Sequence, residues 1–229
     1  MRRFIFSLSI LFIFDLSFGQ DKDSVKVKES IDFTPSYIIA GYNAVPLINS
    51  VFFESKTAQE VQLGIDFANY LFMVDYGLQK TSRGDSSYHY ENRGSHFKVG
   101  IEANVLKNAS FGNSLTLGLR YAMSRFKDEI NFERNYGFGS TAFDRSNSQA
   151  KSRWFELTLG LNVKVAKPIY FGYTVRYKVF RKNSGIEGLE PYDIPGFGRN
   201  SNQSTVGFDY YIRWIIPLKK EEEVPEESN

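Results

Sequence analysis

The residues between 114 and 124 alternate strictly between large apolar side chains and small or polar ones. The large members are Leu115, Leu117, Leu119, Tyr121 and Met123. A period of two places successive side chains on opposite faces of a β-strand. The stretch is also as long as a tilted strand that crosses a bilayer, which needs about 9–11 residues. It therefore predicts a strand with one apolar face, whose setting depends on whether the chain repeats the pattern.

The pattern recurs along the chain. Further alternating segments occupy residues 36–44, 60–67, 72–79, 97–105, 155–164, 169–179 and 206–216. Aromatic residues make up 16% of the chain, which favours strands over helices. Long connecting segments follow every odd-numbered strand, at 45–58, 80–94, 126–151 and 181–203, and short turns follow the even-numbered ones. We therefore expect one domain over residues 35–218, an all-β, eight-stranded antiparallel up-and-down β-barrel.

Eight strands also suit a soluble lipocalin-like barrel, and alternation alone does not say which face points inward. The polar faces of the segments carry repeated mid-strand glycines, such as Gly100, Gly118 and Gly160, which a solvated strand surface seldom has. A narrow lumen needs small residues and can pair charges. We therefore favour a transmembrane barrel with long outward loops, short periplasmic turns and both termini in the periplasm.

This interpretation assigns each face of the strands to one environment. The predicted lumen charge network is Asp66, Asp75, Lys98, Glu102, Arg120, Glu156, Lys164, Arg176, Lys178, Asp209 and Arg213. The predicted lipid-facing set is Leu115, Leu117, Leu119, Tyr121, Leu157, Leu159, Leu161, Phe171, Tyr173, Val175, Phe208, Tyr210 and Ile212. Arg120 is expected to pair with Glu102 or Glu156 on a neighbouring strand. Trp154, Tyr121 and Trp214 suit an aromatic girdle at the membrane interface.

The two ends of the chain differ from the strands. Residues 1–19 combine a basic start, an apolar run and small residues before Gln20, which predicts a cleaved secretory signal peptide, although an uncleaved anchor is the alternative. Residues 20–34 are a polar, flexible periplasmic lead-in, and residues 219–229 an acidic, disordered tail. The chain has no cysteine, so disulfides, thiolate metal sites and lipid attachment at the cleavage site are excluded.

Four segments resemble a family of small outer-membrane proteins of Bacteroidota that is known as a domain of unknown function. They are residues 94–100, 117–121, 206–210 and the loop Ile194-Pro195-Gly196-Phe197. The resemblance covers residues 36–218 and implies an eight-stranded outer-membrane barrel, but it transfers no active site. Asp23-Ser24-Val25 resembles the O-glycosylation acceptor of the same bacteria, which makes Ser24 a possible glycosylation site.

The residues offer little chemistry. His89 and His96, with Asp85, Ser86 and Ser87, could form a catalytic group at the outer rim, but sequence proximity does not establish the required geometry. The two histidines lack the additional ligands of a metal site, so we expect neither metal nor cofactor. A net charge of +2 gives no electrostatic case for nucleic acid.

The leading hypothesis is a non-enzymatic integral outer-membrane barrel that serves as a structural or accessory subunit of a larger complex, for which outer-membrane protein assembly machinery is one host. Its partners would be outer-membrane lipid and other envelope proteins. The aromatic residues of segment 126–151 suit a protein contact: Phe126, Phe132, Tyr136, Phe138 and Phe143. Two alternatives stay open: a small-solute pore, and a rim hydrolase or acyltransferase that uses His89 or His96.

Overall fold

The computed structural model describes most of the predicted barrel. The described residues are 34–46, 48, 55–68, 70–85, 87–106, 110–136, 139–186, 189–201 and 203–219. The predicted signal peptide, Ser24 and the acidic tail from residue 220 onward lie outside them, as does all of the lead-in before residue 34. The described part of the chain includes no helix that is long and apolar enough to span a membrane.

Ten strands account for most of the described residues. They are β1 (Pro35–Asn43), β2 (Lys56–Phe67), β3 (Tyr70–Gly84), β4 (Tyr88–Asn104), β5 (Ser114–Tyr136), β6 (Gly139–Ala166), β7 (Ile169–Ser184), β8 (Asp193–Ile194), β9 (Gly198–Arg199) and β10 (Thr205–Pro217).

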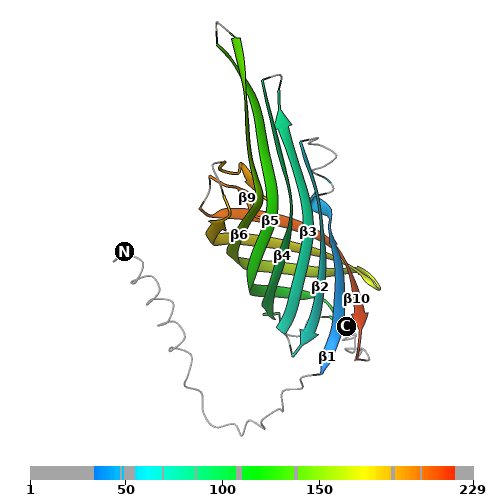
Figure 1. Cartoon of the computed structure of the whole chain (residues 1–229). Helices are drawn as coiled ribbons and strands as arrows, with labels where there is room; N and C mark the ends of the chain where they lie inside the picture. The colour runs from blue at the N-terminus through cyan, green and yellow to red at the C-terminus, as the bar shows by residue number, and fades with distance from the viewer. Residues whose placement is uncertain are drawn as a thin grey trace, which may run out of the picture. The chain divides into compact units, whose positions relative to one another are not determined.

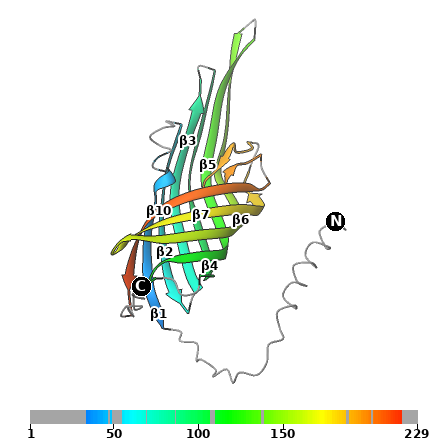
Figure 2. The same ribbon diagram turned by 180° about the vertical axis from the view of Figure 1, so that it is seen from behind.

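Eight of these strands form a closed antiparallel barrel in the order β1-β10-β7-β6-β5-β4-β3-β2 (Figures 1 and 2). Each strand pairs with its sequence neighbours in the ring, and β1 closes it by pairing with β10 from Tyr37 to Asn43. The predicted eight-stranded up-and-down barrel is therefore confirmed. The short strands β8 and β9 form a separate hairpin in the connection between β7 and β10.

Two segments that the sequence predicted as polar loops are strands. Residues 80–84 and 88–94 belong to β3 and β4, and residues 126–136 and 139–151 belong to β5 and β6, which stay paired up to Tyr136 and Gly139. The reason is that backbone pairing continues after the apolar alternation ends, so a polar segment can extend a strand. The excursions on this side are long, as expected, and the β5–β6 hairpin (green) reaches furthest beyond the ring in Figure 1.

The interior of the barrel has apolar groups at both ends. Near the start of β1 and the end of β10, Tyr37, Ile39, Leu71, Met73, Tyr170 and Ile215 form one buried cluster, against which Phe111 packs. At the opposite end, Ala122, Phe126, Ala150, Trp154, Ile194 and Phe197 form a second. Charged and polar side chains fill the space between them, so the lumen is a layered core rather than an open channel.

Inward-facing glycines allow the polar side chains to cross this narrow lumen. A Cβ atom on Gly100 would lie 2.2 Å from the carbonyl oxygen of Leu119 and 2.8 Å from the Cα atom of Arg120. A Cβ atom on Gly118 would meet the side chain of Glu102 at 2.5 Å. These glycines therefore provide the room that the strands and the charged side chains need.

We expect Gly100→Val to prevent or weaken barrel formation, because the new side chain meets backbone atoms that cannot move aside. Overpacking of this kind destabilises by roughly 1–3 kcal/mol or more. The matched control is Gly207→Val, since a Cβ atom there meets only the flexible end of Lys178, at 3.3 Å. Urea titration of both variants in micelles measures the free energies of unfolding, and equal losses would contradict the role given to Gly100.

Candidate functional site

The charged middle of the lumen is organised around Arg176 on β7. Its side chain is fully buried and contacts four carboxylates from four other strands. Nη1 lies 2.9 Å from Glu156 and 3.2 Å from Asp75, Nε lies 2.5 Å from Asp209, and Nη2 lies 3.8 Å from Glu60. The Arg176 side chain also donates to the hydroxyl of Tyr211. A guanidinium has five N–H donors in a planar fork, which is why one arginine can join several strands at once.

Arg120 on β5 forms the second centre of this network. It pairs with Glu102 on β4, as the sequence predicted, and with Asp75 on β3. It forms no ion pair with Glu156, the other predicted partner, although the two residues are opposite each other on β5 and β6. Asp75 therefore contacts both Arg120 and Arg176 and connects the two arginines across the lumen.

Glu60 and His96 belong to the lumen although the sequence reasoning placed neither in the network. Glu60 Oε2 lies 2.7 Å from Lys98 Nζ and 2.7 Å from His96 Nε2, and the three side chains are almost completely buried. His96 had been expected in or beside a polar loop. Both residues continue the alternation of their strands, since Glu60 shares a face with Gln62 and His96 with Lys98, and that signal could have identified them.

The other predicted network residues differ in their surroundings. Arg213 hydrogen-bonds neutral amides, with Nε 2.9 Å from Gln62 Oε1, and Lys178 Nζ donates to the carbonyl oxygen of Gly196 at 2.8 Å. Asp66 is buried near the end of β2, where Ser36 hydrogen-bonds it. Lys164 is half-buried and has no ion pair among the described residues. The residues at the centre of the predicted network are therefore joined by ion pairs, whereas Asp66 and Lys164 are not part of it.

The connection between β7 and β10 folds into the mouth of the barrel, where its residues 192–199, including the β8–β9 hairpin, form a plug loop. Asp193 anchors it: its Oδ2 accepts hydrogen bonds from Lys56 Nζ at 2.8 Å, Gln79 Nε2 at 2.7 Å and Thr81 Oγ1 at 3.1 Å. Asn92 Nδ2 donates to the Asp193 carbonyl oxygen at 3.1 Å. One residue of the loop is thereby joined to β2, β3 and β4.

The apolar part of the plug loop fits against the lumen wall. Phe197 meets Trp154 edge to face, with 5.5 Å between ring centroids, and Gly196 lies over His96. Gly196 has a φ of +79°, and a Cβ atom there would lie 2.5 Å from His96 Cγ, so only glycine fits. Trp154 is fully buried and donates from Nε1 to Glu156, so its predicted place in an interfacial girdle is wrong.

The plug loop does not fill the mouth completely. A pocket of about 350 Å³ remains beside it, lined among others by Glu60, His96, Lys98, Lys178 and Phe197. On the other side of this pocket the arginine–carboxylate network and the apolar cluster around Tyr170 occupy the lumen. The described residues therefore leave a vestibule at one end, and the geometry gives no support to a solute pathway.

All thirteen residues predicted to face lipid point out of the barrel, opposite to the lumen residues of the same strands. Leu119 is 61% exposed, and Leu115, Tyr121, Tyr173 and Val175 are half-buried against neighbours on the same face. Equivalent residues of other strands join them, including Leu63, Phe72 and Val99. Together they form an apolar belt around the outside of the ring.

Asp85, Ser87 and His89 line one pocket at the rim, where the Ser87 hydroxyl is hydrogen-bonded to Asp85 and not to His89. Ser87 Oγ donates to Asp85 Oδ1 at 2.6 Å, and the Ser87 backbone N–H donates to the same oxygen at 2.7 Å. These bonds hold the pKa of the exposed Asp85 carboxyl below its usual range. His96 is in the lumen, away from Asp85 on the rim, and Ser86 lies outside the described residues. Among the described residues no cluster of His, Asp or Glu could hold a metal ion.

We expect Arg176→Met to destabilise the barrel by about 3–5 kcal/mol, because removing one partner leaves buried carboxylates uncompensated. Arg213→Met is the matched control: it also removes a buried arginine, but one hydrogen-bonded to neutral amides. Adding Asp209→Asn to Arg176→Met should restore part of the loss. The free energy of unfolding is measured for all three variants in micelles. An Arg176→Met variant as stable as the wild type would show that the network does not stabilise the barrel.

Comparison with known proteins gives a family but no function. The family model described as "Domain of unknown function (DUF6048)" matches residues 1–221. No curated protein matches the sequence. Among solved structures, CarO of Acinetobacter baumannii is similar with a TM-score of 0.36 and 11% identity, over 80% of this chain and 98% of that one. A likeness of this degree supports no inference about function or location.

Proposed function

This chain belongs to the DUF6048 family, and we propose that it is a non-enzymatic integral β-barrel of the outer membrane that serves as a structural or accessory subunit of a larger envelope assembly. The observation that carries the proposal is the reversal of polarity between the two faces of the ring. Arg120, Arg176 and Glu156 are buried inside the barrel, whereas Leu119, Phe171 and Phe208 are more than half exposed on its outside.

A membrane explains this reversal. Water on the outside would leave large apolar side chains unfavourably exposed on seven of the eight barrel strands, β2 to β7 and β10, at roughly 25 cal/mol per Å² of apolar surface. A closed ring leaves no unpaired strand edge, so its backbone groups are satisfied in lipid. A soluble eight-stranded barrel of the lipocalin kind places its apolar faces inward instead.

We expect Leu119→Arg to destabilise the barrel folded into vesicles by about 2–4 kcal/mol, because the side chain lies in the middle of the belt. The control is Ser146→Arg, which introduces the same group at an exposed position of the β5–β6 hairpin outside the belt. The folded wild type should migrate differently in gel electrophoresis before and after heating. Release of the wild-type protein with the soluble periplasmic fraction would refute the membrane location.

The subunit role is supported by the β5–β6 hairpin. Phe132 on β5 and Phe143 on β6 stack with ring centroids 5.0 Å apart and an interplanar angle of 13°, and Phe143 is 37% exposed. The pair lies beyond Lys151, the first residue of β6 that pairs with β7, and at the level where the pairing of β5 with β4 ends at Phe132. An exposed aromatic pair on a projecting, hydrogen-bonded support is suited to a protein contact. Phe126, by contrast, is buried inside the barrel, so its predicted place in such a contact is wrong.

We expect the protein to co-purify with other envelope proteins in mild detergent, and the Phe132→Ser/Phe143→Ser variant to lose them. Phe180→Ser is the matched control, because Phe180 is 81% exposed on β7 and not on the hairpin. Quantitative mass spectrometry of the eluates measures both. Recovery of the wild type alone, with intact heat-modifiability, would count against the subunit role and leave the barrel proposal standing.

A further inference from the structure

The outer surface carries a group of basic residues directly beyond the apolar belt. Seven exposed bases follow one another along β3 to β7, and we name them the basic arc: Lys80, Arg93, Arg125, Lys127, Lys151, Arg153 and Lys182. They are neighbours in register, since Lys80 is opposite Arg93, Arg93 opposite Lys127, Arg125 opposite Lys151 and Arg153 opposite Lys182. At the corresponding level β2 presents the uncharged Thr57 and Gln59, so the arc occupies one sector of the ring.

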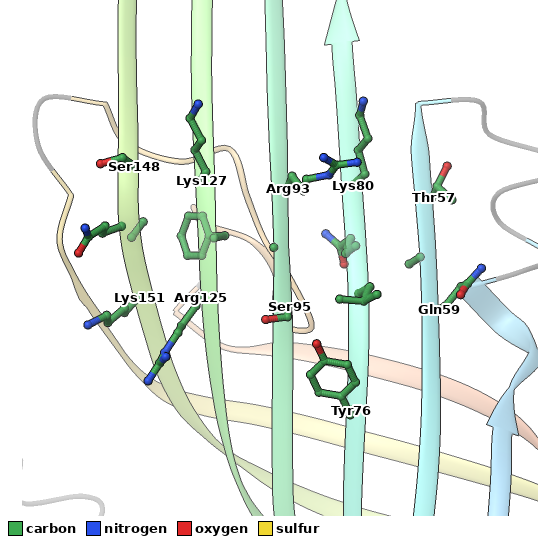
Figure 3. Close-up of a pocket in the computed structure, with 17 residues that line it drawn as sticks. Thr57, Gln59, Tyr76, Lys80, Arg93, Ser95, Arg125, Lys127, Ser148 and Lys151 are labelled. Carbon is green, nitrogen blue, oxygen red and sulfur yellow. The ribbon is translucent and has the colours of Figure 1, made fainter.

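Five members of the arc surround a hollow of about 860 Å³ in this surface (Figure 3). They are Lys80, Arg93, Arg125, Lys127 and Lys151, from four adjacent strands. The small residues Gly94, Ser95 and Ser148 also line the hollow. Its remaining wall includes Tyr76 and Leu78, which are 47% and 51% exposed and belong to the apolar belt. The hollow therefore has a basic part and an apolar part in direct contact.

Acidic residues neutralise only part of this charge. Lys80 Nζ lies 3.1 Å from Glu91, and Lys127 Nζ lies 3.4 Å from Glu129. Arg93, Arg125 and Lys151 have no ion pair among the described residues. Three neighbouring cations without acidic partners repel one another, so an anion placed between them would be favourable.

We propose that this hollow binds the phosphate group of a phosphorylated lipid in the leaflet at the hairpin side of the barrel. The inference rests on the proposed membrane location, because the belt then brings lipid headgroups to the level of the arc. Arg93, Arg125 and Lys151 bind the phosphate, since arginine matches phosphate geometry and lysine provides a point charge. Tyr76 and Leu78 contact the acyl chains of the same molecule, which a free anion lacks.

The test uses the full-length mature protein in mild detergent, with monophosphorylated lipid A and its dephosphorylated counterpart as probes and native mass spectrometry as the readout. The wild type should bind the phosphorylated lipid in preference to the other. The Arg125→Gln/Lys151→Gln variant should bind it at least about tenfold more weakly, since a basic residue near a lipid surface contributes about 1 kcal/mol. The charge-conserving Arg125→Lys/Lys151→Arg variant should retain most of the affinity.

The matched control, Arg145→Gln/Lys167→Gln, removes the same charge outside the arc and should bind like the wild type. Equal losses in both double variants, or equal binding of both lipids, would overturn the inference. Displacement of the lipid by millimolar inorganic phosphate would identify a free-anion site and overturn it as well. Insertion into phosphatidylcholine vesicles is measured in parallel: failure to insert refutes the membrane barrel, whereas insertion without lipid discrimination refutes only the lipid site.

Discussion

Everything in this structure depends on how little room an eight-stranded ring leaves inside. A lumen of this width is filled by side chains, and a charge placed in it must find an opposite charge within reach. Arg176 meets that requirement by contacting Glu156, Asp75 and Asp209 from three strands at once. The same narrowness demands glycine at Gly100, where a side chain would meet the neighbouring backbone.

The polar interior also determines what the outside must be. Because side chains alternate along a strand, the buried Arg120 on β5 and Glu156 on β6 are flanked by side chains that point outward, and these are leucines and aromatic residues: Leu119, Tyr121, Phe155 and Leu157. Beyond the belt the outward positions change to bases such as Arg125 and Lys151, while pairing between the strands continues. One continuous hairpin therefore passes through three environments: an apolar belt, a charged boundary and a projecting end.

The ring could be predicted because alternation reports the two faces of a strand directly, and the Arg120–Glu102 pair followed from neighbouring strands. The strand ends could not, because apolar alternation ends at Met123 whereas β5 continues to Tyr136. The position of the plug loop could not be predicted from the sequence either. Asp193 contacts Gln79, more than a hundred positions earlier in the chain, and no periodic pattern encodes such a contact. Trp154 was misplaced because aromatic residues suit both a lumen and an interface.

The length of β5 has a consequence for distance. From Arg125 at the basic arc to Tyr136 at its end, a strand that rises about 3.3 Å per residue extends up to about 36 Å. Since β6 pairs with it over this length, the hairpin is a stiff spacer rather than a tether. In the proposed membrane location, Tyr136 and Gly139 at the ends of β5 and β6 thus stand clear of a surrounding layer of headgroups and sugars, where a large partner can approach them without touching the bilayer.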